Sequence, residues 1–407
     1  MYKYFFLFSF VIISQNLVSQ DIEGLNKYSL SVYTDLDGGS QKLSSKFIDK
    51  YVRGGYIDNE TKDAFFSKLE SKNRAGVVWD TKIELKKYSG NSDNKRRSYQ
   101  LLGFENYYLY EAEFTNDLFG LYFYGNKRYE NTKADLSDMR FKSLKFQVIK
   151  FGFYQQFQRL GFGLNGGLVL GQNYLTVETN KASIYTADHG QYLDLDINAK
   201  STSSDFSQDK LFSAVGKGLS VDAKIDFWYQ GNSKIGFELN RLGFIKWGEN
   251  LKEQSVDTSY RFEGINISSI IDSFVIDLKS PEEFKDELVH SKLSEKRNRA
   301  LPVQYAFNLH HSFKDEKLWL DAKLTMMPNT LYKTSFQCDL NYQFIRLLTL
   351  GVDAGVGGYS SWNTGINVGV RLAKFITVDL KARSLFNIYN LNKPAALIGS
   401  AKLVIGF

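Results

Sequence analysis

The chain has 407 residues and a formal net charge of +6, from 51 basic and 45 acidic side chains that are dispersed along the sequence. Such a balance does not indicate a nucleic-acid-binding protein. Aromatic residues make up 15% of the chain, prolines number only 4, and the single cysteine is Cys338. The composition favours aromatic-rich strands over helical bundles, and it excludes a disulfide framework and a thiolate metal cluster.

Residues 1–20 have the features of a secretory signal peptide. Lys3 precedes the apolar run YFFLFSFVII, and a polar tail with the small residue Ser19 follows it. The run is too short to span a bilayer, and no later segment has about 18 uninterrupted apolar residues. We therefore expect an exported protein without a transmembrane helix, and we exclude residues 1–20 from the fold.

Residues 21–75 form an N-terminal segment with helical character. A first strand is predicted near residues 28–34, and two short helices follow it, separated by the glycine pair at 54–55. Asp58 is a suitable N-cap for the second helix, because its carboxylate can accept hydrogen bonds from the free N–H groups of the first turn. We expect this segment to plug a barrel formed by residues 76–407.

Alternation of apolar and polar residues dominates the rest of the chain. In TSFQCDLNYQF, residues 334–344, Phe336, Leu340 and Tyr342 belong to one series, and the other series is wholly polar. A β-strand points successive side chains to opposite faces, so one face of this strand meets an apolar environment and the other meets water. The predicted strands cover residues 77–85, 98–110, 140–157, 161–174, 175–186, 192–199, 219–229, 235–247, 303–313, 318–326, 334–344, 348–356, 362–372, 376–383 and 397–407.

This pattern predicts an all-β fold, a transmembrane antiparallel β-barrel of about 14 to 16 strands. A soluble sandwich shows similar alternation with its apolar face inward, but a sandwich of this length usually divides into Pro-rich repeats of about 100 residues. The chain also ends in AKLVIGF, which looks like the C-terminal recognition signal of bacterial outer-membrane barrels. We therefore expect a protein of the cell outer membrane, in contact with its lipid.

The lengths of the connections assign the two ends of the barrel. Counting back from a periplasmic C-terminus makes the short turns periplasmic, as is typical of bacterial barrels. The same count puts the long segments 112–139, 200–217, 248–302 and 387–395 on the outside.

The external insertion 248–302 predicts two amphipathic helices. In the second, Ser280 is placed as N-cap and Pro281 as the first helical residue. Their apolar faces could pack on each other and cover the barrel, or they could bind an apolar ligand or a partner protein. The residues predicted to make such contacts are Ile271, Phe274, Val275, Leu278, Phe284 and Leu288.

The polar faces of the late strands predict the lining of the lumen. They carry charges of both signs, whereas an ion-selective porin tends to have rings of one sign. A salt-bridge network and a narrow or plugged pore are therefore favoured. The glycines at 351, 355, 357, 365 and 369 indicate either a bend or space where another segment packs. The predicted lumen-lining residues are Asp339, Asp353, Arg371, Asp379, Lys381 and Arg383.

No catalytic or cofactor motif is found. GFGLNG at residues 161–166 opens a strand and not a helix, so it lacks the geometry that holds a phosphate. The four histidines have no metal-ligand spacing, and no Ser/His/Asp grouping can be assembled. We expect no enzyme activity, no cofactor and no metal.

Several phrases resemble an uncharacterised family of Bacteroidetes outer-membrane β-barrel proteins. These are GGYIDNETKDAFFSKLESKNRAG near the N-terminus, the run that begins FTNDLFGLYFYGNKRYENTK, and LGFIKWGENLKEQSVDTSYRFEGI. The resemblance covers most of the mature chain and implies the location and the fold, but no substrate or functional residue. In plan, the chain is similar to long-chain fatty-acid transporter barrels, which take up apolar molecules.

Two functions remain open at this point. The first is uptake of a small, apolar solute across the outer membrane. The alternative is an accessory or scaffold barrel in an envelope secretion or surface-export complex, with the external helices as an interface to other envelope proteins.

Overall fold

The computed structural model describes residues 26–54, 56–89, 98–204, 211–248, 251–263, 290–294, 297–313, 317–385, 387 and 394–407. The predicted signal peptide lies outside the described residues. So do the six predicted contact residues between Ile271 and Leu288. None of the helices in the described ranges is long and apolar enough to cross a membrane.

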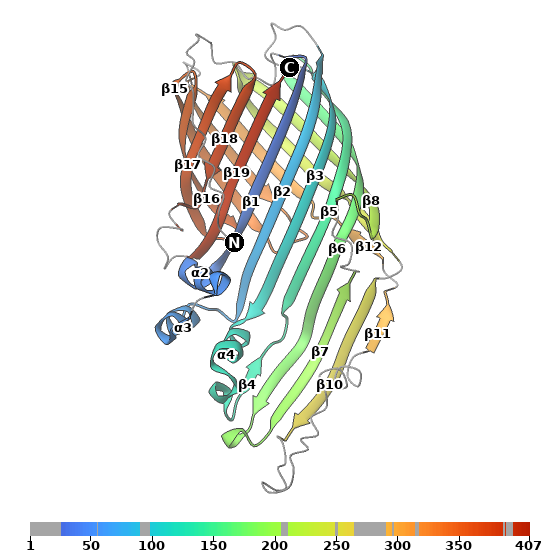
Figure 1. Cartoon of the computed structure of the whole chain (residues 1–407), viewed down its shortest axis with the longest axis vertical. Helices are drawn as coiled ribbons and strands as arrows, with labels where there is room; N and C mark the ends of the chain where they lie inside the picture. Colours follow the sequence, from blue (N-terminus) through green and yellow to red (C-terminus); the bar gives the residue numbers. More distant parts are fainter. Residues whose placement is uncertain are drawn as a thin grey trace.

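Fourteen antiparallel strands close into a barrel, as the sequence predicts (Figure 1). The first strand pairs with the last from Ser29↔Gly406 to Gly39↔Ala396, which leaves the ring without a free edge. The barrel strands are β1 (Tyr28–Ser44), β2 (Lys72–Ser89), β3 (Ser98–Thr115), β5 (Arg140–Gln156), β6 (Leu160–Thr186), β8 (Gly216–Gln230), β9 (Ser233–Trp247), β13 (Gln304–Ser312), β14 (Leu318–Met326), β15 (Lys333–Ile345), β16 (Leu348–Gly358), β17 (Trp362–Ala373), β18 (Ile376–Ala382) and β19 (Pro394–Gly406).

The alternation in the sequence becomes an apolar outer wall and a polar lumen. On β15, Phe344 is 59% exposed on the outer wall, whereas Asp339 on the other face is 4% exposed. The outward series of the other barrel strands also expose large apolar side chains, such as Phe151 and Val352. A folded protein has such a continuous apolar surface only where lipid or a partner protein shields it from water.

The two ends of the barrel differ in their connections. The turns β5–β6, β8–β9, β15–β16 and β17–β18 are short, and they lie at the end where Tyr28 and Phe407 exchange backbone hydrogen bonds. The opposite end carries the long connections and the helices (Figure 1). This asymmetry follows the predicted pattern, and the assignment of the short-turn end to the periplasm stays a prediction.

A sheet extension projects from the long-connection end. The barrel half of β6 pairs with β8, and its outer half pairs with β7 (Leu193–Ser203), which pairs in turn with β10 (Lys252–Phe262). The short strands β4 (Lys133–Asp135) and β11 (His290–Leu293) border the extension, and β12 (Asn298–Ala300) pairs with β9.

The extension corrects two sequence predictions. Residues 161–174 and 175–186 form one strand and not two, because no turn separates them and the irregularity near Gln172 is absorbed as a bulge opposite Lys145/Phe146. Within 248–302, β10 was not predicted, because its sequence KEQSVDTSYRF is largely polar and its hydrophobic signal is weak.

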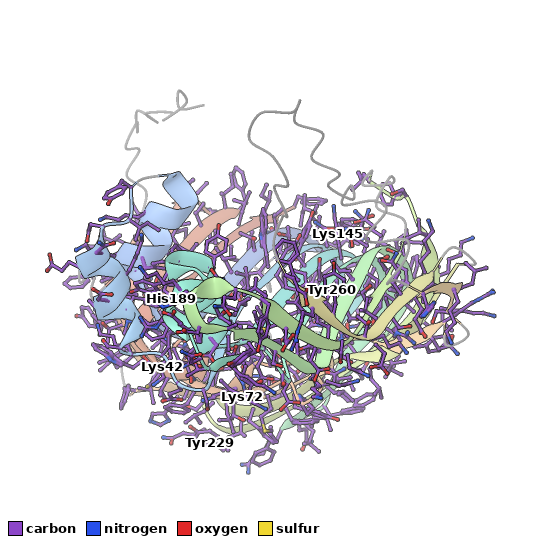
Figure 2. All side chains as sticks on the ribbon, turned by 90° about the horizontal axis from the view of Figure 1, so that it is seen from below. Lys42, Lys72, Lys145, His189, Tyr229 and Tyr260 are labelled. Atoms are coloured by element: carbon purple, nitrogen blue, oxygen red, sulfur yellow. The ribbon has the colours of Figure 1, made fainter. Side chains whose placement is uncertain are left out.

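Three α-helices pack together beside the barrel strands. α2 (Ser45–Arg53) ends at Gly54, whose φ of 74° fits a glycine C-cap, and α3 (Asn59–Phe66) begins after the predicted cap Asp58. Both helices pack against α4 (Asn116–Tyr124), at one edge of the barrel in the view from below (Figure 2). Residues 21–75 therefore supply barrel strand β1 as well as two helices. The buried side chains of this helical cluster are Leu43, Phe47, Phe65 and Phe119.

Candidate functional site

The inward side chains of the barrel strands form the candidate functional site, and they fill much of the lumen. An apolar layer lies toward the long-connection end, where Trp247 and Tyr359 are each 1% exposed. These side chains pack against one another in this part of the lumen. The apolar layer consists of Tyr107, Leu109, Leu144, Phe146, Val148, Val169, Tyr174, Ile245, Trp247, Leu251, Leu301, Leu331 and Tyr359.

An ion network adjoins the apolar layer. Arg241, 1% exposed, reaches from β9 across to β2 and β3, where its Nη1 lies 3.0 Å from Glu105 Oε1 and 3.4 Å from Asp80 Oδ2. Its guanidinium also lies 4.4 Å from the ring centroid of Tyr107, in the apolar layer. We call Arg241, Asp80, Glu105, Lys150 and Asp222 the Arg241 network.

A backbone irregularity aims Arg241 into the lumen. Its φ is 62°, in the left-handed region that non-glycine residues rarely adopt, and the β8–β9 register shifts between Val221 and Ala223. The backbone N–H of Arg241 donates to Asp222 Oδ1 at 2.7 Å, and Nε donates to the carbonyl oxygen of Pro302 at 3.1 Å. The bulge is thus held by a side chain of β8 and by the backbone of the segment that precedes β13.

Lys150 completes the network from β5. Its Nζ forms a short ion pair with Glu105, and a second one with Asp222 Oδ2 at 2.5 Å. Buried charges persist only where opposite charges and hydrogen bonds compensate their lost hydration. The network therefore ties β2, β3, β5, β8 and β9 together.

The predicted lumen-lining residues lie on β15 to β18 and on the turn that follows. Asp339 forms ion pairs with Lys381 Nζ at 2.5 Å and with Arg383 Nη2 at 3.4 Å, and we call these three residues the Asp339 cluster. Asp353 is directly opposite Asp339 in register and is also 4% exposed. Arg371 and Asp379, on β17 and β18, are half-buried.

The Asp339 cluster borders a cavity of about 250 Å³ inside the barrel. Its lining is largely charged, with acidic and basic side chains interspersed. The other ionisable side chains around the cavity are Lys224, Asp226, Lys234, Glu238, His310, Asp321 and Lys323.

Neighbouring side chains occupy the space over two of the inward glycines. A Cβ at Gly355 would lie 2.1 Å from Gln337 Oε1, and one at Gly351 would lie 2.2 Å from Asn341 Oδ1. The glycines of β16 therefore make room for polar side chains of β15.

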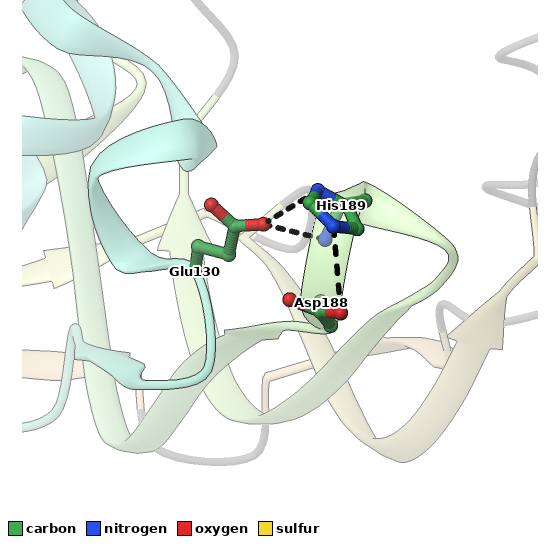
Figure 3. Close-up of side chains that lie close together, drawn as sticks. All are labelled: Glu130, Asp188 and His189. Atoms are coloured by element: carbon green, nitrogen blue, oxygen red, sulfur yellow. Dashed lines mark hydrogen bonds and ion pairs between the residues drawn. The ribbon is translucent and has the colours of Figure 1, made fainter.

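A second cluster of ionisable groups lies on the outer connections (Figure 3). Glu130 Oε1 accepts the backbone N–H of His189 at 2.5 Å and lies 3.5 Å from its Nδ1, whereas His189 Nε2 lies 3.7 Å from Asp188 Oδ2. Different ring nitrogens face the two carboxylates, and the imidazole is 84% exposed. This geometry fits surface ion pairs better than a shared metal ion.

Sequence reasoning missed both the Arg241 network and the cluster of Glu130, Asp188 and His189. Glu130 and His189 are 59 residues apart and meet only through the β6 extension. In a regular strand, Arg241 would face the outer wall, on the side opposite to Glu238 and Asn240. The bulge turns it into the lumen instead, and a pattern of period two does not reveal this change.

A model of a family described as "Family of unknown function (DUF5723)" matches residues 27–379. No curated protein matches the chain. Solved structures with similarity include a TodX deltaS2S3 mutant monoaromatic hydrocarbon channel, with a TM-score of 0.46, 10% identity, and coverage of 94% of this chain and 91% of that chain. A Pseudomonas aeruginosa FadL homologue has a TM-score of 0.40 at 10% identity over 93% and 88% of the two chains. The outer membrane protease OmpT from Escherichia coli has a TM-score of 0.24 at 9% identity over 94% and 97%. These values are too low to assign a function.

Proposed function

The chain belongs to this family of unknown function, and from the barrel itself we propose that it is a non-enzymatic outer-membrane protein that takes up a small apolar solute. Export by the predicted signal peptide and the strand-like C-terminus support the location. So does the apolar outer wall, because it matches a lipid environment. An origin in Bacteroidetes rests on the sequence resemblance alone.

The apolar layer is the observation that carries the proposal. A solute entering from the long-connection end meets aromatic and aliphatic side chains, among them Phe146, Trp247 and Leu301. An apolar molecule can replace contacts among these side chains without breaking hydrogen bonds, whereas a charged molecule would lose its hydration there. The layer therefore favours apolar solutes.

The Arg241 network is a barrier on the far side of the apolar layer. Its buried ion pairs offer an apolar solute no favourable contact, so release requires them to move apart or the solute to bypass them. Uptake in this account is slow and selective. The predicted external contacts Ile271, Phe274, Val275, Leu278, Phe284 and Leu288 remain candidates for first capture.

Binding of the apolar fluorescent probe N-phenyl-1-naphthylamine to the purified barrel tests the proposal. Phe146→Asn places an amide in the apolar layer and should weaken probe binding at least tenfold, whereas Phe146→Leu keeps an apolar side chain and should retain it. Both variants must remain folded barrels, as judged by heat-dependent mobility on gels. Equal binding by the Asn and Leu variants would contradict the proposal.

The accessory-barrel alternative predicts a different bound species. Native mass spectrometry of protein extracted from its own membrane would then find a stoichiometric protein partner and no small molecule. A stoichiometric apolar molecule would instead support uptake and give its chemical class.

A further inference from the structure

The outer wall of β8 and β9 changes from apolar to basic at the same level. On β8 the outward series runs through Phe227, Ile225, Ala223, Val221 and Leu219 and then reaches Lys217, and on β9 the corresponding series ends at Lys246. Ten residues at about 3.3 Å each, in a strand tilted by about 40°, rise roughly 25 Å, the height of a membrane barrel's apolar band. Both lysines therefore lie at the boundary of this band, at the long-connection end.

The two lysines face the same surface side by side. Lys217 and Lys246 are direct cross-strand partners, and both are exposed. Like charges in this arrangement repel each other, since directly opposite side chains have Cβ atoms only about 5 Å apart. In the described part of the chain, neither ammonium group has a hydrogen-bond or ion-pair partner, so nothing there offsets the repulsion.

An apolar ledge lies close to the pair on the outer wall. Leu211 and Phe212, 65% and 57% exposed, precede β8 in the chain. The backbone N–H of Phe212 donates to Gln147 Oε1 at 3.0 Å, and its ring lies 5.5 Å from that of Phe104. Because Gln147 and Phe104 belong to the outward series of β5 and β3, this segment is held against the outer wall.

We propose that Lys217 and Lys246 clamp the phosphate of an anionic membrane-lipid headgroup, with its acyl chains on the apolar band below. One phosphate between the two ammonium groups turns their repulsion into two charge-assisted contacts. Leu219 and Phe244, the next outward residues, are 54% and 44% exposed and offer the acyl chains an apolar surface. The site is independent of solute uptake through the lumen.

A third outward lysine on this wall is differently placed. Lys145 on β5 stacks over the ring of Tyr108, with Nζ 4.8 Å from the centroid. Because this cation–π contact already compensates the charge of Lys145, we do not include it in the lipid clamp formed by Lys217 and Lys246.

Native mass spectrometry of the full-length barrel, titrated with phosphatidylglycerol or with phosphatidylcholine of the same acyl chains, tests the proposal. The unmodified protein should bind one phosphatidylglycerol more tightly than phosphatidylcholine. In the double variant Lys217→Gln, Lys246→Gln the tight site should weaken roughly 30-fold, from about 1 kcal/mol per lysine near a lipid surface. The double variant Lys217→Arg, Lys246→Arg should keep it.

A charge-matched control separates the clamp from a general loss of positive charge. Lys127→Gln combined with Lys252→Gln removes two exposed lysines away from this outer wall and should leave phosphatidylglycerol binding unchanged. Equal binding by the clamp variant and the unmodified protein would overturn the proposal. So would inorganic phosphate that displaces phosphatidylglycerol at equal concentration, because the site would then take a free anion and not a lipid.

Discussion

The Arg241 network and the Asp339 cluster contain the same kinds of charged groups but perform different tasks. Arg241 and Glu105 have side chains that are each 1% exposed, and they join opposite parts of the wall through a bulge. Asp339 contacts Lys381, whose side chain is 27% exposed, beside a charged cavity. The difference teaches that charged side chains join distant strands where the bulge of β9 turns Arg241 into the lumen, whereas in the regular parts of β15 and β18 they line a cavity.

Loss of the central cation in the Arg241 network should have the largest effect. Arg241→Met leaves Glu105 and Asp80 with less compensation in a buried site, so the free energy of unfolding should fall by about 3–5 kcal/mol. Denaturant unfolding of the barrel in lipid vesicles measures this quantity. A loss below about 1 kcal/mol would mean that water reaches the network, and the contrast between the two clusters would fail.

The corresponding change in the Asp339 cluster should cost less. In Lys381→Met, Asp339 keeps Arg383, and the neighbouring cavity can admit water to the place that the ammonium group leaves. The free energy of unfolding should fall by about 1 kcal/mol under the conditions used for Arg241→Met. Comparable losses in the two variants would show that both clusters are equally dry.

The smallest effect is expected at a charge outside the barrel. The side chain of Lys50 and the backbone N–H of Thr61 hold the pKa of Asp58 well below its usual range. Because the folded pKa is lowered, the stabilisation of α3 is present above the ordinary Asp pKa of about 3.9 and is lost as the pH falls toward the folded value.

Hydrogen exchange of the α3 amides measures this effect. Protection should decrease on acidification in the unmodified protein. In Asp58→Asn, which keeps a capping oxygen but no charge, protection should be lower at neutral pH and independent of this titration. An unchanged pH dependence in the Asn variant would assign the effect to another group.

The sequence predicts the wall of the barrel better than its interior. The face on which each side chain lies follows from alternation, so Phe344 and Asp339 could be placed on opposite faces without a structure. The cap at Asp58 and the glycine stop of α2 are local signals, and both are found. These features depend on neighbours within a few residues.

Contacts across the lumen could not be predicted in the same way. Arg241 and Asp80 are 161 residues apart, and their meeting depends on the curvature of the closed sheet and on one bulge. Which inward charges form pairs is decided only when the barrel closes. Period-two alternation specifies the face on which a side chain lies, but it does not specify its partner across the lumen. For the same reason, the mixed charges of β15 to β18 indicated a network but not which members would meet.

Single-channel recording in planar lipid bilayers tests the central claim, that the barrel's own side chains close its lumen. The unmodified protein should show no steady conductance, because the apolar layer and the Arg241 network both occupy the lumen. A wide, permanently open pore in the unmodified protein would contradict the account and make the barrel a diffusion porin.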